Sequence, residues 1–221
     1  METAADRVFL LAIDVTSAPA ELATALRVER DELIQLLDQA RIELGELEMV
    51  VICTEERIEL YGAGGNWRRG FRLLLRQFGA RTAGFAGLGS LRVLEANGVP
   101  AGRHLVRITA GLETALVHSE ALRVVDEAAQ AAKLAGTLSQ DLEVLFNSAA
   151  AAAARRVSET DGADAELAVP EIERIVEEEL TAWQAWCARD SRRIGSAPRA
   201  SGFPTEPFTF IRDIKSRRTV A

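Results

Sequence analysis

Side chains capable of acid, base and nucleophilic chemistry are concentrated in residues 50–61. An apolar run gives way there to a thiol, two carboxylates and a guanidinium, and then resumes. Successive side chains of a strand point to opposite faces, so Cys53, Glu55 and Arg57 share one face if the extended conformation persists. The pattern predicts a buried strand that ends at a site where these groups converge. An edge strand running into a charged turn is the alternative interpretation.

The composition indicates a globular protein with a proper core. The chain has 221 residues, of which 48% are hydrophobic, and a net charge of −7, which argues against a surface that coats nucleic acid but permits a local basic groove. Cys53 and Cys187 lie far apart and form no metal-ligand cluster, which fits a reducing compartment. The acidic N-terminus does not resemble a signal peptide, and no apolar run reaches the length of a membrane span. We therefore expect a cytoplasmic protein with no bound metal and no membrane contact.

The order of predicted elements is that of an α+β protein. Residues 1–102 alternate strands and helices, as in a ferredoxin-like sandwich. The strands are expected at 8–15, from 49 into the polar cluster and at 91–96, and the helices at 20–26, 29–44 and 67–78. Residues 103–160 are almost all helix formers, with a break near Gly136, and complete the unit as a helical region. There follow a polar linker at 161–169, a long helix at 170–190 and a basic loop or tail at 191–221.

The long helix has Pro170 in its first turn and carries an apolar stripe. The stripe consists of Ile172, Ile175, Val176, Leu180, Trp183 and Trp186. The tail that follows is too short to cover it. We therefore expect two copies of the chain to pair through this helix as a homodimer.

The helix expected at 67–78 has a basic face. Its arginines are Arg68, Arg69, Arg72 and Arg76. These side chains are suited to contact RNA phosphates, and solvated arginines are an equally good explanation. The glycine-rich run at 79–89 has neither the Lys-Ser/Thr ending of a P-loop nor the spacing of a dinucleotide motif, so we predict no nucleotide cofactor.

Three segments, taken in order, resemble the glutamyl-tRNA reductase family. Residues 50–61 are similar to the family's Ser-Thr-Cys-Asn-Arg segment and the Glu and Tyr that follow it. The matching positions are Thr54, Arg57, Glu59 and Tyr61. Residues 104–114 are similar to its His-Leu-Phe-Arg-Val-Ala-Ala-Gly-Leu-Asp-Ser, and residues 155–160 to its Arg-Val-Arg-Thr-Glu-Thr. The resemblance spans nearly the whole chain, and it implies that the partner is an aminoacyl-tRNA.

Two departures limit what the resemblance implies. After Thr160 the family enters an NADPH domain of the Rossmann kind, whereas here a short linker leads into 169–173, which resembles the start of the family's long spinal helix. Without a dinucleotide fingerprint, hydride transfer has no donor. The family's catalytic cysteine position is occupied by Glu55, and Cys53 lies where the family has serine. A carboxylate cannot readily form the thioester of the reductase reaction.

The resemblance assigns substrate-binding roles to Thr54, Arg57, Glu59 and Thr114. Arg57 would hold a glutamyl carboxylate through a bidentate contact, and the alternative is an ion pair with Glu55 or Glu59. Thr54 and Thr114 would orient an ester carbonyl, or they make ordinary strand and helix hydrogen bonds.

Catalytic roles are predicted for Glu55, His104 and Cys53. Glu55 would act as general base, and His104 falls on a pocket histidine of the family that is able to move a proton. A histidine before a helix is otherwise more often a cap or core residue. For Cys53, a packing residue at the end of a buried strand is the preferred interpretation.

Together these observations predict an aminoacyl-tRNA-dependent acyl transferase, of a kind suited to specialised metabolism. The pocket would bind the aminoacyl end of tRNA, and a small-molecule amine, not hydride, would receive the acyl group. The alternative is a non-catalytic tRNA-binding or regulatory homologue in tetrapyrrole biosynthesis. A reductase that obtains its nucleotide domain from another chain ranks third.

Overall fold

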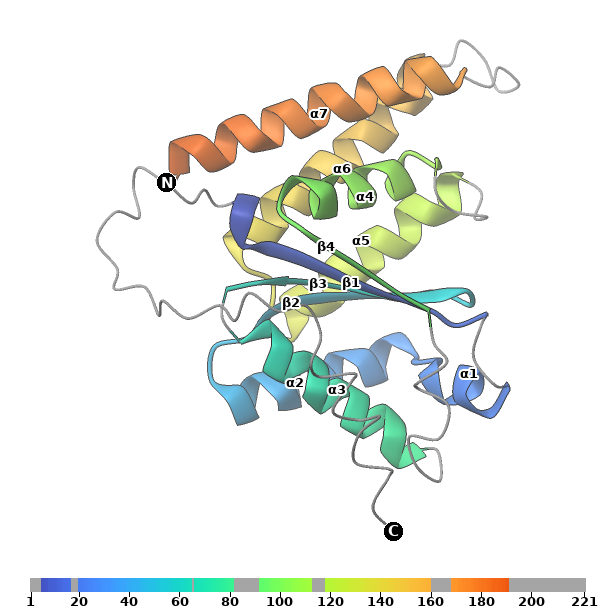
Figure 1. The fold of residues 1–221 in the computed structure, drawn as a ribbon, viewed down its shortest axis with the longest axis vertical. Coiled ribbons are helices and arrows are strands. Elements are labelled where there is room, and N and C mark those ends of the chain that lie inside the picture. The colour runs from blue at the N-terminus through green and yellow to red at the C-terminus, as the bar shows by residue number, and fades with distance from the viewer. Residues whose placement is uncertain are drawn as a thin grey trace.

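A four-stranded antiparallel sheet forms the centre of the protein (Figure 1). The computed structural model describes residues 5–16, 20–64, 66–81, 92–112, 118–159 and 168–190. Along the chain, the strands are Val8–Asp14 (β1), Glu48–Cys53 (β2), Arg57–Ala63 (β3) and Arg92–Asn97 (β4). In the sheet they lie in the order β2-β3-β1-β4. The first strand lies between the third and the fourth, as in a ferredoxin-like sandwich, which confirms the predicted α+β fold.

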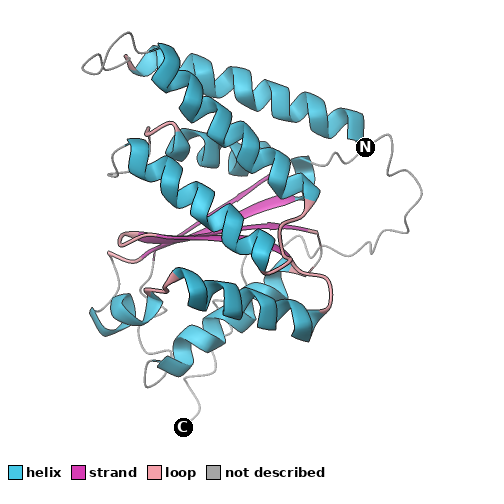
Figure 2. Cartoon of the chain, turned by 180° about the vertical axis from the view of Figure 1, so that it is seen from behind, coloured by secondary structure: helices cyan, strands magenta, loops and turns pink. Residues whose placement is uncertain are grey.

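Helices cover both faces of the sheet (Figures 1 and 2). Below it in Figure 1 lie α1 (Ala20–Leu26), α2 (Arg30–Leu44) and α3 (Trp67–Arg81), and above it α4 (Val99–Thr109), α5 (His118–Leu134), α6 (Gln140–Glu159) and α7 (Val169–Asp190). One continuous hydrophobic core joins the sheet to both helical layers. No helix in the described ranges has both the length and the apolar character needed to cross a bilayer.

Glycines with positive φ angles mark the helix boundaries. Gly136 (φ 71°) follows α5 at the predicted break, and Gly98 (φ 63°) precedes α4, which has Pro100 in its first turn. Glycine adopts these angles without the steric cost that a Cβ would bring. The helical region therefore begins at Val99, slightly earlier than residue 103, where the composition changes.

The extended conformation on which the shared face of Cys53, Glu55 and Arg57 depended does not persist, because the chain reverses at the polar cluster. β2 ends at Cys53 and β3 begins at Arg57 as its antiparallel neighbour. The Thr54 hydroxyl closes this hairpin: it accepts from the Arg57 amide at 3.0 Å and lies 3.1 Å from the Arg57 carbonyl, to which it donates. Ile52 is paired with Glu59, so Cys53 lies on the opposite face of the sheet from Arg57 and Glu59. The alternative, an edge strand leading into a charged turn, describes this segment.

The apolar stripe of α7 is buried within the chain, against α4 and α6. Trp183 is 1% exposed and lies on Gly102, where a Cβ would come within 2.5 Å of the indole ring. Trp186 is partly buried against the same core. The expectation that the stripe is left uncovered is therefore wrong. Homodimerisation stays a prediction, but the apolar stripe of α7 no longer supports it. A measurement of the molar mass in solution by light scattering would test it.

Candidate functional site

A buried carboxylate on β3 contacts two basic side chains. Glu59 is 1% exposed, and its Oε1 lies 3.3 Å from both Arg57 Nη1 and His104 Nε2. The Tyr61 hydroxyl donates to Oε2 at 3.0 Å. Strand alternation places Arg57 and Tyr61 on the same face as Glu59, and His104 reaches that face from α4. A buried carboxylate needs such partners, because burial without them is costly.

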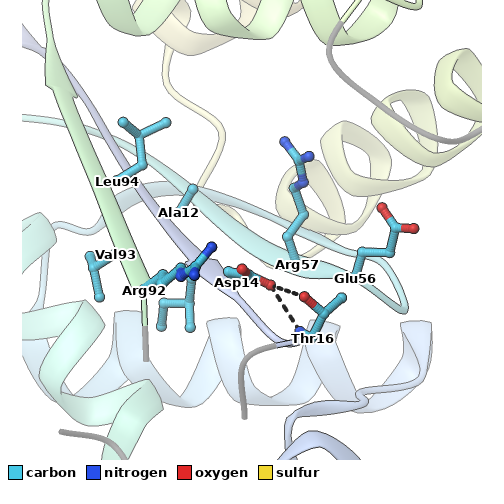
Figure 3. A pocket seen from close by; sticks show the side chains of 9 residues that line it. Ala12, Asp14, Thr16, Glu56, Arg57, Arg92, Val93 and Leu94 are labelled. Carbon is cyan, nitrogen blue, oxygen red and sulfur yellow. Dashed lines mark hydrogen bonds between the residues drawn. The ribbon is translucent and has the colours of Figure 1, made fainter. Parts of the chain in front are cut away.

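A pocket of about 370 Å³ lies beside Arg57, over the end of β1 (Figure 3). Its polar lining residues are Asp14, Thr16, Glu56, Arg57 and Arg92, and its apolar lining residues are Ala12, Ile13, Val93 and Leu94. Asp14 is the register partner of Arg57 on one side and of Arg92 on the other. Asp14 is thus carried by the strand between those of the two arginines, and this set of charges suits a small ligand that carries both negative and positive charge.

The predicted convergence of Cys53, Glu55 and Arg57 is not formed. The Glu55 side chain, 84% exposed at the hairpin tip, lies 3.7 Å from Arg27 Nη1, whereas its neighbour Glu56 lines the pocket. Burial raises the pKa of the Cys53 thiol to about 12. The thiol is therefore protonated near neutral pH and is a poor nucleophile, which supports the packing interpretation.

Among the other predicted residues, Thr54 and the arginines of α3 do not line the pocket. The Thr54 hydroxyl is engaged in the hairpin turn, and Thr114 lies outside the described residues. On α3, the Arg68 guanidinium lies over the Trp67 ring, 5.1 Å from its centroid. The exposed arginines of this helix are Arg69, Arg72 and Arg76. The α3 helix lies below the sheet in Figure 1, whereas Glu59 contacts His104 of α4, a helix that lies above the sheet.

Three charged residues of the pocket were missed by sequence reasoning: Asp14, Glu56 and Arg92. Asp14 Oδ1 accepts from the Thr16 amide at 2.9 Å and from the Thr16 hydroxyl at 2.6 Å, which fixes the carboxylate at the end of β1. A carboxylate at the end of an apolar strand was a usable signal. Arg92 had no such signal, because only the pairing of β4 with β1 brings it beside Asp14.

The part of the chain that the structure describes has no cluster of metal-ligating side chains, and the interval between α6 and α7 is short. They contain no group of three His, Cys, Asp or Glu side chains arranged to hold a metal ion. α6 ends at Glu159 and α7 begins at Val169. That interval is far shorter than the roughly 30 residues of a dinucleotide-binding βαβ unit.

The fold and the pocket define a ferredoxin-like sandwich with an added helical layer and a charged site at the end of its sheet. The sequence model of the family "Glutamyl-tRNAGlu reductase, N-terminal domain" matches residues 11–160. The chain therefore belongs to this family.

A solved structure supports the same fold. Glutamyl-tRNA reductase from Methanopyrus kandleri superimposes with a TM-score of 0.52 at 21% sequence identity, over 86% of this chain and 53% of that chain. The chain thus spans about half the length of that enzyme. A search of curated proteins gives no match.

Proposed function

We propose that this protein binds the aminoacyl end of a charged tRNA in the pocket and transfers the acyl group to an amine. Membership of the reductase family supports the tRNA partner. The observation that carries the proposal is Arg57, which lines the pocket and contacts the buried Glu59 carboxylate. A guanidinium held in this way is preorganised to bind the carboxylate of a glutamyl group.

The proposed reaction needs positioning and one proton acceptor. The amine nitrogen attacks the ester carbonyl, so a C–N bond forms and the C–O bond to the terminal ribose breaks. The proton released by the amine passes to a carboxylate and then to the departing ribose oxygen. Glu56 lines the pocket and is the better-placed base, and Glu55 remains the candidate that the sequence suggested. An aminoacyl ester is already activated, so no redox step is required.

His104 and Tyr61 are assigned positioning roles. Both contact Glu59, and Glu59 in turn contacts Arg57 at the pocket wall. Through this chain of contacts the α4 helix fixes the arginine that is proposed to bind the substrate. The proton-transfer role expected for His104 stays a prediction.

A non-catalytic tRNA-binding role is the second candidate function. It is favoured by the state of the thiol and of the residue at the family's nucleophile position. The Cys53 thiol has a raised pKa, and the Glu55 side chain is 84% exposed at the hairpin tip. Neither residue is suited to form an acyl-enzyme.

Amide formation by the purified chain distinguishes these functions. Glutamyl-tRNA and other aminoacyl-tRNAs are incubated with methylamine, with and without protein, and the amide is quantified. Glu56→Gln is expected to lower the rate by about 10² to 10⁴ at an unchanged tRNA Kd, and Glu55→Gln is its matched control.

The outcomes of this experiment are distinct. Loss of activity in Glu55→Gln, with Glu56→Gln still active, would identify Glu55 as the general base. Tight binding without amide formation would establish the second candidate, and absence of binding to any aminoacyl-tRNA would refute both.

A further inference from the structure

The pocket contains a second arginine that the donor substrate does not require. Arg57 is proposed to bind the donor, while Arg92 lies on the other side of β1. We propose that Arg92 and Asp14 form the acceptor subsite, and that the acceptor is an amine that also carries a carboxylate, such as an amino acid. This inference rests on the proposed acyl transfer and specifies its second substrate.

The spacing of the strands fits two linked substrates. Neighbouring strands lie about 4.8 Å apart, so the backbones of Arg57 and Arg92 are separated by roughly 10 Å. An extended dipeptide spans roughly 7 Å. A glutamyl group joined to an amino acid therefore places one carboxylate near each arginine. Figure 3 shows Arg92 extending toward Asp14 from one side, while Arg57 rises from the other.

The charges of the pocket match those of an amino acid. Asp14 lies between the two arginines and is oriented by its hydrogen bonds from Thr16, so it is placed to accept from an ammonium group. Each guanidinium has five N–H donors, so it can keep its contacts within the protein and still bind a carboxylate. Leu94, which is 50% exposed, offers the acceptor's carbon chain an apolar contact.

The chemistry is balanced without a further reactant. The acceptor ammonium first loses one proton to solvent and becomes a neutral amine. On attack, its nitrogen forms the C–N bond while the ester C–O bond breaks. The second proton passes to Glu56 and then to the ribose oxygen, which leaves as a hydroxyl group.

Matched acceptors test the subsite in the full chain with glutamyl-tRNA. Glycine, L-alanine and L-leucine are each compared with the corresponding amino acid amide, which has the same amine but no carboxylate. The amino acids are expected to exceed the amides by about tenfold or more in kcat/KM, as one charge-assisted contact allows. Arg92→Gln is expected to remove this preference and leave the Kd for glutamyl-tRNA within about twofold. Arg123→Gln, an exposed arginine on α5, is the control.

The other outcomes separate failure of the subsite from failure of the proposed function. If the amides react as well as the amino acids in both proteins, acyl transfer stands but the carboxylate subsite does not exist. If Arg92→Gln weakens tRNA binding and lowers its salt dependence, Arg92 contacts the tRNA backbone instead. If no amine reacts, the proposed function fails. Calorimetric titration of the free protein with each amino acid then decides the subsite separately: binding that is lost in Arg92→Gln supports it, and no binding refutes it.

Discussion

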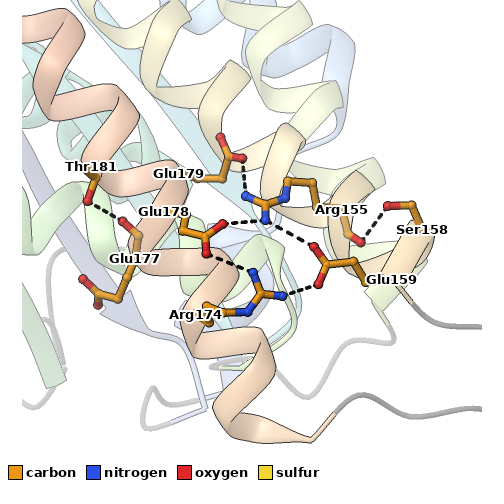
Figure 4. Close-up of polar contacts among 8 residues, drawn as sticks. All are labelled: Arg155, Ser158, Glu159, Arg174, Glu177, Glu178, Glu179 and Thr181. Carbon is orange, nitrogen blue, oxygen red and sulfur yellow. Dashed lines mark hydrogen bonds and ion pairs between the residues drawn. The ribbon is translucent and has the colours of Figure 1, made fainter.

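Two clusters of arginine and glutamate lie in different surroundings in this protein. The first, on the sheet, joins Glu59 to Arg57 and His104. The second joins α6 to α7 and consists of Arg155, Glu159, Arg174, Glu178 and Glu179 (Figure 4). Glu59 in the first cluster is 1% exposed, whereas the Arg174 side chain in the second is 49% exposed.

The exposed cluster has the larger number of contacts. Arg155 lies 2.6 Å from Glu178, 3.1 Å from Glu179 and 3.2 Å from Glu159. The hydrogen bonds that Arg155 donates to Glu178 and Glu179 raise the pKa of Arg155, and those that Glu178 accepts from Arg155 and Arg174 lower the pKa of Glu178. Water and salt screen these interactions, so they contribute little to stability.

The comparison teaches that burial, not the number of ion pairs, decides how much a charged cluster contributes to the stability of the fold. Replacing Glu59 removes a charged partner of both Arg57 and His104 in a partly buried site. α7, by contrast, is held mainly by the apolar contacts of its stripe, and its ion pairs lie around the rim.

Removing the buried carboxylate should have the largest effect. Glu59→Ala is expected to lower the free energy of unfolding by about 3 to 5 kcal/mol, because the partners of a buried ion pair lose their counter-charge. Urea denaturation measures this loss. Glu55→Ala, at the exposed hairpin tip, is the control and should be close to wild type. Equal effects of the two substitutions would contradict the contrast between buried and exposed charge.

Desolvation should suppress the reactivity of Cys53, which is partly buried. A rise in pKa from 9.0 to about 12 lowers the thiolate fraction at pH 8 by a factor on the order of 10³. This factor is measured in a Cys187→Ala background, by comparing the rate at which iodoacetamide alkylates Cys53 in the native protein with the rate in the denatured protein. Alkylation of the native protein at the denatured rate would show that the thiol is accessible and ionised, and would reopen a covalent route.

Packing beneath α7 should matter more than its ion pairs. Gly102→Ala is expected to cost about 1 to 3 kcal/mol, because the added methyl group overlaps the Trp183 ring. Chemical denaturation, monitored by tryptophan fluorescence, measures this loss in the free energy of unfolding. The double variant Gly102→Ala with Trp183→Leu should be less destabilised than the sum of the two single variants. Strict additivity would show that the two residues do not contact each other.

Breaking the exposed cluster should have the smallest effect. Arg174→Ala is expected to change Tm by about 2 °C or less at neutral pH. Because the pKa of Glu178 is lowered in the folded state, its contribution is present above its unfolded pKa of about 4.3 and is lost as the pH falls through the folded value. Wild type and variant should therefore converge in acid, and a loss as large as that of Glu59→Ala would overturn the comparison.

Helix ends and apolar periodicity are local properties, and here they were readable from the sequence. Gly136 ended a helix because residues with a side chain rarely adopt its φ angle, and the apolar stripe of α7 was identified residue by residue. The ferredoxin-like order also followed, because alternating strands and helices permit few topologies. The hairpin at Thr54 was missed because its turn lacks glycine and asparagine and is closed by a side-chain hydroxyl.

The site depended on contacts that only the tertiary structure supplies. The resemblance identified Arg57, Glu59 and His104, but the packing of α4 on the sheet decided that they form one cluster around a buried carboxylate. The pairing of β4 with β1 decided that Arg92 lies beside Asp14. The physical reason is that sequence periodicity fixes which face of an element a side chain occupies, whereas strand register and helix packing fix which residue it meets there.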